Sequence, residues 1–220
     1  MNVNAPPTTI VSKDGLEITF QEHMLYIPTW RAALAKLAAD VEAELDDLCC
    51  SSPLTIPPVV PDDWTDETRG YSWTMNDPNR FGLQNSNLLF YKLLSDHTLA
   101  QTTNGVLLLN KVVMASLLER CDQVCKNIFL LVFNTVSQAP RISEIADYKY
   151  ANSTWGRNML HNDKAIWFLN WQLKYESLLW KESSIASKAS PQVTKLLEKY
   201  FLLVWPLEKE LAYHLLEGED

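Results

Sequence analysis

Residues 110–138, NKVVMASLLERCDQVCKNIFLLVFNTVSQ, decide the fold of this chain. A regular spacing of three or four residues connects Val113, Leu117, Cys121, Val124, Ile128, Leu131 and Thr135. This spacing matches the 3.6 residues of an α-helical turn, so the stretch predicts one long helix, or two, with a single buried stripe. Pro140 lacks a backbone N–H group and ends the pattern.

A second helix is predicted for residues 30–48, with Thr29 as its N-cap. Its apolar positions again fall three and four residues apart, at Trp30, Leu34, Leu37, Ala38, Val41, Leu45 and Leu48. The opposite face carries five carboxylates: Asp40, Glu42, Glu44, Asp46 and Asp47. Such an acidic stripe is typical of the solvated face of an amphipathic helix.

Upstream and downstream of residues 30–48 the pattern is less regular. Asp14-Gly15 predicts a hairpin turn between two short β-prone runs in residues 9–27. Four prolines make residues 51–61 a linker or an extended strap. Residues 62–80 are irregular and aromatic, and aromatic side chains in such a loop usually hold it to the core.

The rest of the chain predicts short elements. These are helices at residues 86–96 and 142–150, turns at 152–163, a strand at 165–173 and a helix with Ser190 as its N-cap and Pro191 in its first turn. Val193, Leu196, Leu197, Tyr200, Phe201 and Val204 are expected on the buried side of that last helix. Pro206 is expected to interrupt it.

The composition is that of a globular protein with its own core. Of 220 residues, 47% are hydrophobic and 21% are charged. No apolar run reaches the ~18 residues of a membrane helix, and the N-terminus lacks the regions of a signal peptide. We therefore expect a soluble intracellular protein, nuclear or cytoplasmic, with no membrane partner. Cys49, Cys50, Cys121 and Cys125 are expected to be free buried thiols.

The net charge of −8 is unevenly distributed. Residues 1–100 carry 6 basic and 14 acidic side chains, whereas residues 141–199 carry 9 basic and 6 acidic ones. A strong sequence-independent DNA-binding protein is normally more basic than this. Any contact with nucleic acid is therefore expected in the later part of the chain.

Common catalytic and metal-binding motifs are missing. The sequence has no GxGxxG, GxxxxGK[ST], GxSxG or HExxH motif. The four histidines, His23, His97, His161 and His214, are scattered, and there are no CxxC pairs. We therefore expect neither a metal site nor a cofactor.

One constellation does point to chemistry. Residues 138–145, QAPRISEI, end one predicted helix and begin another, and a predicted strand that closes on Lys174 follows about thirty residues later. This run resembles the first conserved box of tyrosine recombinases, in which an R-I-S-E-L-like sequence supplies the first catalytic arginine. Arg141 matches that arginine, and Lys174 matches the lysine of the downstream β-hairpin.

The resemblance is closest to the recombinase-like regions of fungal mobile elements and of fungal telomere-linked helicase-like proteins. Those regions show a G/Q-x-P-x-R-x-x-E-L run, an Arg-Asn pair, a strand that ends in lysine and a helix that begins with proline. The counterparts here are residues 138–144, Arg157-Asn158, residues 165–174 and residues 191–205. Asp14-Gly15, residues 30–48 and Gly70-Tyr71-Ser72 are also similar, so the likeness extends from about residue 10 to residue 206.

The resemblance implies a role for each matched residue. Arg141 would hold two nonbridging phosphate oxygens, Glu144 would orient it, and Lys174 would protonate the leaving oxygen. Arg157, Asn158 and Lys181 would contact DNA. The simpler alternative is that Arg141 and Glu144 form an i, i+3 ion pair and that Lys174 is an exposed strand lysine.

Two parts of the recombinase site have no counterpart. The His-x-x-Arg box and the nucleophilic tyrosine would lie beyond residue 220, and the nearby pair Tyr213-His214 fits neither. The Tyr-His-Lys cluster of the family is here Gln172-Leu173-Lys174. Without a covalent nucleophile, the vestigial site of Arg141, Glu144 and Lys174 is expected not to cleave DNA.

Together these observations predict a mainly α fold with a small β component. Residues 1–104 would form a helical N-terminal region, and residues 105–220 the first half of a recombinase-like catalytic domain. The expected function is that of a truncated or degenerate DNA-binding domain whose partners are duplex DNA, bound weakly, and a protein partner or a missing C-terminal half. The alternative is a non-enzymatic helical module for protein–protein interaction.

Overall fold

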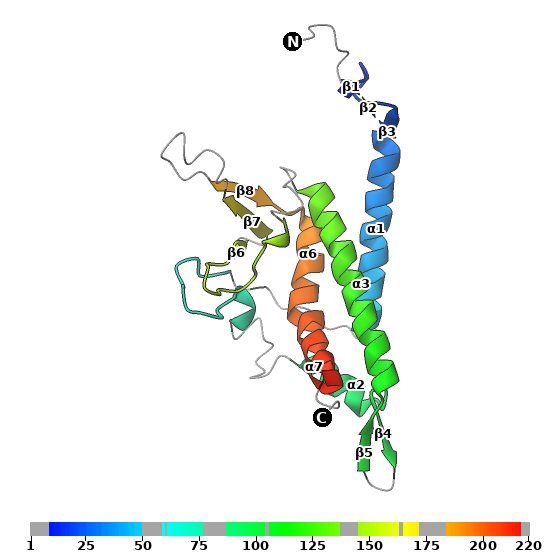
Figure 1. Cartoon of the computed structure of the whole chain (residues 1–220), viewed down its shortest axis with the longest axis vertical. Coiled ribbons are helices and arrows are strands. Elements are labelled where there is room, and N and C mark those ends of the chain that lie inside the picture. The colour runs from blue at the N-terminus through cyan, green and yellow to red at the C-terminus, as the bar shows by residue number, and fades with distance from the viewer. Residues whose placement is uncertain are drawn as a thin grey trace.

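The computed structural model describes residues 9–49, 59, 61–76, 87–103, 106–136, 145–162, 165–171 and 184–216. In that part the chain is mainly α-helical with three small antiparallel sheets, so the predicted fold class is confirmed at this level. Figure 1 shows long helices side by side, a three-stranded sheet on one side of them and a small sheet at either end. None of the helices described is long and apolar enough to span a membrane.

Helix α3 (Lys111–Thr135) forms as a single helix of 25 residues. The Asn110 side chain caps its first turn and accepts a hydrogen bond from the Val113 N–H group, at 3.2 Å. The buried side chains of the helix are Met114, Leu117, Cys121, Val124, Ile128, Leu131 and Val132. The predicted stripe is therefore confirmed, although Val113 and Thr135 at its two ends are only partly buried.

Helix α1 (Ile27–Leu48) begins three residues earlier than predicted, and its N-cap is Tyr26. The prediction of Thr29 as N-cap is therefore wrong. Pro28 explains the difference, because its fixed φ and its missing N–H group both suit the first turn of a helix.

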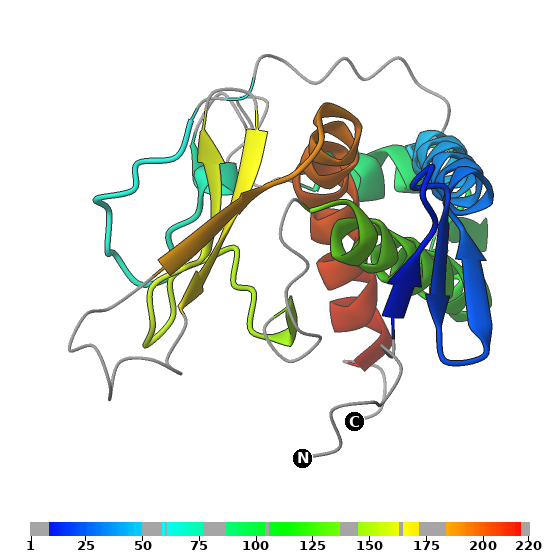
Figure 2. The same cartoon turned by 90° about the horizontal axis from the view of Figure 1, so that it is seen from above.

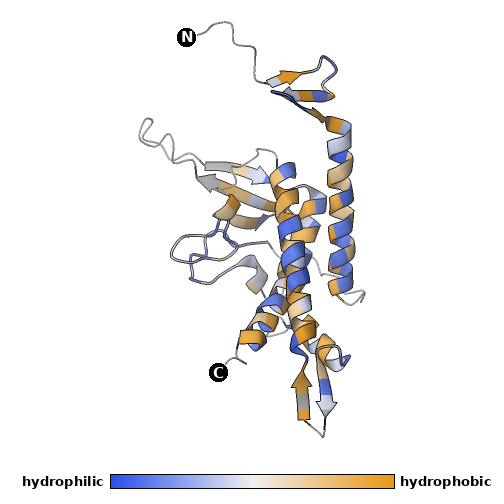
Figure 3. Cartoon of the chain, turned by 45° about the vertical axis from the view of Figure 1, so that its right-hand side comes forward, coloured by the Kyte–Doolittle hydropathy of each residue, from blue (hydrophilic) through white to orange (hydrophobic). Residues whose placement is uncertain are grey.

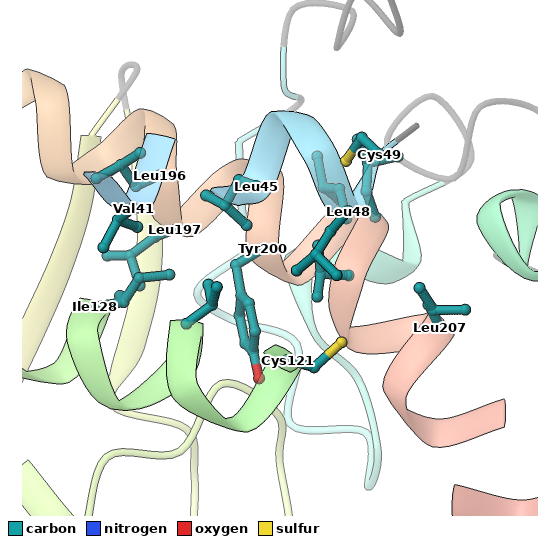
Figure 4. Packing of buried hydrophobic residues seen from close by; sticks show 14 of the residues in the cluster. Val41, Leu45, Leu48, Cys49, Cys121, Ile128, Leu196, Leu197, Tyr200 and Leu207 are labelled. Atoms are coloured by element: carbon teal, nitrogen blue, oxygen red, sulfur yellow. The ribbon is translucent and has the colours of Figure 1, made fainter. Parts of the chain in front are cut away.

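The helices share one hydrophobic core. Figure 4 shows Val41, Leu45 and Leu48 of α1 close to Cys121 and Ile128 of α3 and to residues of the C-terminal helix. Burying one such aliphatic side chain stabilises the fold by about 1.5–3 kcal/mol. Figure 3 shows hydrophobic and hydrophilic residues in bands along the helices, as expected of amphipathic helices. The core cluster draws residues from both sides of the expected boundary at residues 104 and 105.

The acidic face of α1 is only partly solvated. Arg120 of α3 donates hydrogen bonds to Glu44, at 2.6 Å, and to Asp47, at 2.5 Å. Lys199 forms an ion pair with Asp46. Part of the stripe that the sequence assigned to solvent therefore links α1 to its neighbours.

The C-terminal helix is continuous through Pro206. Helix α6 (Pro191–Lys199) begins at Ser190, whose side chain accepts a hydrogen bond from the Val193 N–H group as predicted, at 3.3 Å. It continues as a π-helical segment, η4 (Tyr200–Val204), and then as α7 (Trp205–Leu216). The Trp205 N–H group donates to the Tyr200 carbonyl, five residues back.

The expected interruption at Pro206 is therefore wrong. In an α-helix a proline ring meets the carbonyl four residues before it, here that of Leu202. The wider π turn directly before Pro206 changes this geometry and lets the helix continue.

The sheet formed by the later part of the chain has the order β6-β7-β8. The predicted strand at residues 165–173 is found as β7 (Ala165–Trp171), and residues 172 and 173 lie outside the described part. Strands β6 (Met159–Asn162) and β8 (Ser184–Lys188) pair with it on either side, and both were missed. Phe168 and Ile166 of the inner face are fully buried.

The sheet at the N-terminal end is a meander. Strands β1 (Thr9–Val11) and β2 (Glu17–Phe20) flank the predicted Asp14-Gly15 turn, in which Gly15 has a φ of 70°. A third strand, β3 (His23–Tyr26), follows β2 and leads directly into α1. The hairpin is confirmed, and the third strand was not predicted.

A second hairpin, also unpredicted, joins the short helix α2 (Leu88–Ser95) to α3. Its strands are β4 (Ala100–Thr103) and β5 (Val106–Leu109), and they pair antiparallel. The predicted helix at 86–96 is thus confirmed as α2. Of the predicted helix at 142–150, residues 145–150 are described, and the helical geometry ends at residue 146.

Candidate functional site

Four of the six predicted site residues lie outside the described part of the chain. These are Arg141, Glu144, Lys174 and Lys181. In the sequence, the first two fall between α3 and Ile145, and the two lysines fall between β7 and β8. Their predicted roles therefore remain predictions.

Arg157 is described, and its guanidinium is turned inward. The side chain is 3% exposed, and its partner Asp62 is 0% exposed. Arg157 Nε donates to Asp62 Oδ2 at 2.9 Å, and Nη2 donates to Asp62 Oδ1 at 2.7 Å. This is the two-pronged geometry that a planar guanidinium makes with a carboxylate.

The other N–H groups of Arg157 are also occupied. Nη1 donates to Asn152 Oδ1 at 2.9 Å and to the Asp66 carbonyl at 2.7 Å, and Nη2 also donates to the Asp63 carbonyl. The Tyr71 ring covers the guanidinium at 4.6 Å. A guanidinium has five N–H donors, and all five are used here, so none is left for a phosphate. The expectation that Arg157 contacts DNA is corrected by this position.

Asn158 is likewise used within the fold. Its side-chain oxygen accepts a hydrogen bond from the Lys149 N–H group at 2.6 Å, and its amide donates to the Asp147 carbonyl at 3.3 Å. These bonds fix the turn that leads into β6. Every guanidinium donor of Arg157 and part of the Asn158 side-chain amide are therefore used within the fold.

The Arg157 cluster ties two loops together, residues 61–71 and residues 152–158, which we call the tryptophan loops because they carry Trp64 and Trp155. Asn152 Nδ2 donates to the carbonyls of Asp66 and Thr68, at 2.8 and 3.1 Å. The backbones also bond to each other, from Gly70 to Asn152 and from Asn152 to Tyr71. Figure 2 shows these loops and the β6-β7-β8 sheet on the side of the molecule away from α1.

No known protein family, curated protein or solved structure gives a significant match to this chain. The site must therefore be interpreted from its own geometry.

A second buried polar contact joins the sheet to the helices. His161 Nε2 of β6 lies 2.8 Å from Glu198 Oε1 of α6, and the imidazole packs on the Trp73 ring at 5.0 Å. His161 is fully buried. His161 is thus a buried structural residue that contacts the partly buried Glu198, whereas the sequence suggested a surface or capping residue.

Two ionisable side chains of the helical core, Cys121 and Tyr200, are not activated. Burial raises the pKa of the Cys121 thiol to about 12, and burial also raises the pKa of Tyr200. A thiol with a raised pKa is protonated near neutral pH and is a poor nucleophile. Cys49 and Cys121 are buried as expected, and Cys50 lies outside the described residues. Cys125 is exposed, so the prediction of a buried thiol is wrong at this position.

A shallow cleft of about 260 Å³ lies between residues 70–75 and the C-terminal helix. Tyr150, Phe201 and Trp205 form its aromatic wall, and Trp205 Nε1 donates to the Tyr150 hydroxyl at 2.8 Å. Lys209 lies at its edge, over the Trp205 ring. Within the described residues, no group of three or more histidine, cysteine or acidic side chains is placed to hold a metal ion.

The outer face of the β6-β7-β8 sheet carries a cation. Lys188 of β8 is opposite Trp167 of β7, and its Nζ atom lies 5.6 Å from the centre of the indole ring. Lys188 is exposed. This face of the sheet therefore presents one exposed cation, that of Lys188, beside an indole ring.

Sequence reasoning missed the inward turn of Arg157 because its partner is 95 residues away. No local pattern links Asp62 to Arg157. A signal was present in the composition, since the strap that precedes Asp62 ends in proline and the loop after it is rich in acids. Such a loop needs an internal cation if one of its carboxylates is to be buried.

Proposed function

We propose that this chain is a recombinase-like domain that binds duplex DNA weakly and does not cleave it. The observation that supports the proposal is the order of elements α3, β6-β7-β8 and α6. The resemblance requires an arginine after the first helix, a lysine in a hairpin and then a helix that begins with proline. Arg141 follows α3 in the sequence, Lys174 falls between the antiparallel strands β7 and β8, and Pro191 begins α6.

The charge of this region limits the affinity. Residues 141–199 contain 9 basic and 6 acidic side chains, and Arg157 is withdrawn by its ion pair with Asp62. With about 3–4 phosphate contacts, the affinity should fall with roughly the third power of salt and lie near ~10⁻⁴–10⁻⁶ M.

A salt titration of duplex binding tests the proposal. Arg141→Gln and Lys174→Gln should each weaken binding and reduce the salt slope by about 1, because each removes one phosphate contact. Lys13→Gln, at an exposed position in the N-terminal turn, is the matched control and should change neither. Tight binding that is insensitive to salt would contradict the proposal.

The test must use the full chain. Removal of the acidic first hundred residues would also remove α1, whose Val41, Leu45 and Leu48 are part of the shared core. Neutralising exposed acids of α1, such as Asp40 and Glu42, leaves the core intact and should strengthen DNA binding by reducing repulsion.

Cleavage is tested with a nicked duplex as a suicide substrate. We expect no covalent protein–DNA adduct, since the motifs that would supply a nucleophilic tyrosine and a second arginine have no counterpart in the sequence. A phosphotyrosine linkage would overturn this part of the proposal.

The second candidate function is a module for protein–protein interaction, and the meander β1-β2-β3 favours it. Its strands expose large apolar side chains on both faces: Ile10, Val11, Phe20, Met24, Leu25 and Tyr26. Small sheets are rarely stable without a covered face, and clustered exposed apolar residues mark interaction sites. Absence of DNA binding by the full chain at low salt would favour this candidate.

A further inference from the structure

The tryptophan loops expose two of the largest apolar side chains in the described part of the chain. Trp155 is 73% exposed and Trp64 is 48% exposed, whereas Trp73, a few residues from the end of the first loop, is fully buried. Tryptophan supplies a large, rigid contact surface and is enriched where proteins bind one another. Two exposed tryptophans on linked loops therefore need an explanation.

Both tryptophans are held by fixed backbone. The Trp155 carbonyl accepts a hydrogen bond from the Ser153 N–H group at 2.9 Å, and the Trp155 N–H group donates to Ser153 Oγ at 3.2 Å. Trp155 also lies between Asn152 and Arg157, the two residues that link the loops. Its backbone is therefore ordered before any partner arrives, which lowers the entropic cost of binding.

Trp64 is held in the same way. The carbonyl of the preceding residue, Asp63, accepts a hydrogen bond from Arg157. The Asp63 carboxylate accepts hydrogen bonds from the Thr65 N–H and hydroxyl groups at 2.9 and 2.7 Å. One buried arginine thus braces the backbone next to both exposed rings.

The surroundings of the rings are acidic. The first loop carries Asp63 and Glu67 at exposed positions, Asp66 at a half-buried position and a single cation, Arg69, while Asp62 is neutralised internally by Arg157. Hydrogen bonds from Thr65 lower the pKa of Asp63, so this carboxylate is charged at neutral pH. The loop therefore combines exposed aromatic rings with excess negative charge.

We propose that the tryptophan loops are a docking surface for a cationic peptide segment of a partner protein. Lysine or arginine side chains of the partner would lie over the faces of Trp155 and Trp64, where the ring quadrupole attracts a cation. The carboxylates of Asp63, Asp66 and Glu67 would balance the remaining charge.

A nucleic acid fits this surface less well. Phosphates would meet three carboxylates, and the buried guanidinium of Arg157 has no free donor to offer them. Charge complementarity therefore selects a basic peptide over DNA.

The test measures binding of a fluorescein-labelled peptide of alternating lysine, arginine and glycine residues to the full chain by anisotropy. Trp155→Ala and Trp64→Ala should each weaken binding about 5- to 30-fold, and Glu67→Gln about 2- to 5-fold. Val112→Ala is the matched control, because Val112 is an exposed apolar residue in α3, and it should bind as the unchanged chain does. Far-ultraviolet circular dichroism checks that each variant folds.

Four outcomes would overturn the proposal. The first three are no binding of the peptide by the unchanged chain at millimolar concentration, binding that neither tryptophan variant alters, and equal binding of a peptide in which glutamate replaces the basic residues. Competition by duplex DNA that depends on Trp155 would also overturn it, since the surface would then bind nucleic acid.

Discussion

The helical core and the tryptophan loops each contain an arginine that links two distant segments. Arg120 joins α3 to Glu44 and Asp47 of α1, and its side chain is 36% exposed. Arg157 joins the two loops through Asp62 and is almost completely buried. The chemical pairs are alike, but their surroundings differ.

The comparison shows how burial changes the role of an ion pair. Around Arg120 the helices are already held by apolar packing, so the exposed pair is an addition to a complete core. Around Arg157 the loops contribute few buried apolar side chains, and the arginine donates to the backbone carbonyls of Asp63 and Asp66 as well as to Asp62. Loss of Arg157 would leave the buried carboxylate of Asp62 without a cation, whereas loss of Arg120 would leave only carboxylates that water can reach.

The largest effect is expected from Arg157→Ala. The variant should lower the free energy of unfolding by about 3–5 kcal/mol, because Asp62 would remain buried without its cation. Urea denaturation followed by circular dichroism measures it. The double variant Arg157→Met with Asp62→Leu is the control and should recover much of the loss. If the free energy of unfolding of Arg157→Ala fell by less than ~1 kcal/mol, the buried ion pair would contribute no more than the exposed pair of Arg120.

Leu45→Ala tests the packing on the other side of the comparison. Leu45 is fully buried between α1 and its neighbours, so the variant should lower the free energy of unfolding by about 2–5 kcal/mol. Leu216→Ala, an exposed leucine near the end of α7, should change it by less than about 0.5 kcal/mol. Similar losses at both positions would show that the core assignment is wrong.

Arg120→Gln should have a small effect. An exposed pair of this kind contributes about 0.2–1 kcal/mol, and the contribution should fall in 1 M salt because the charges are screened. Urea denaturation at low and high salt measures both. A loss of stability as large as that in Arg157→Ala would show that burial does not distinguish the two ion pairs.

The smallest expected effect is on the pH dependence of stability, and it comes from Glu208 of α7. Desolvation raises the pKa of Glu208 above its ordinary value of 4.5, although the Tyr200 hydroxyl donates to it at 2.7 Å. The folded chain therefore holds this proton more tightly than the unfolded chain does. The resulting contribution to stability is complete below pH 4.5 and is lost as the pH rises through the raised pKa.

Glu208→Gln should remove this part of the pH dependence. Urea midpoints measured over a pH series should fall less steeply in the variant than in the unchanged chain as the pH rises. Glu42→Gln, at an exposed position on α1, is the control. Identical pH profiles for the unchanged chain and Glu208→Gln would contradict the prediction.

The long elements could be predicted from the sequence because their signals are local. The stripe of α3 and the Ser190-Pro191 start of α6 each depend on residues a few positions apart, and both were found. Strands β3, β4, β5, β6 and β8 were missed because each has at most five residues and is defined by its pairing partner. Such short runs carry little period of their own.

The candidate site was harder to predict for a related reason. A resemblance assigns a role to Arg157 from its order in the sequence, whereas the actual partner of Arg157 is set by tertiary structure. Solvent exposure of Trp155 has no sequence signal at all, since buried and exposed tryptophans look the same in a single sequence. Exposure could be seen only once the loops were in place.

The ion pair between Asp62 and Arg157 also determines when, during synthesis of the chain, the docking surface can form. Asp62 leaves the ribosome early, and Arg157 follows 95 residues later, after the whole of α3 has been made. Until then Asp62 lacks its partner Arg157, and the loop that contains Trp64 is not held to the second loop. A partner that recognises both tryptophans therefore recognises only chains in which synthesis has passed residue 157 and the two loops have closed on each other.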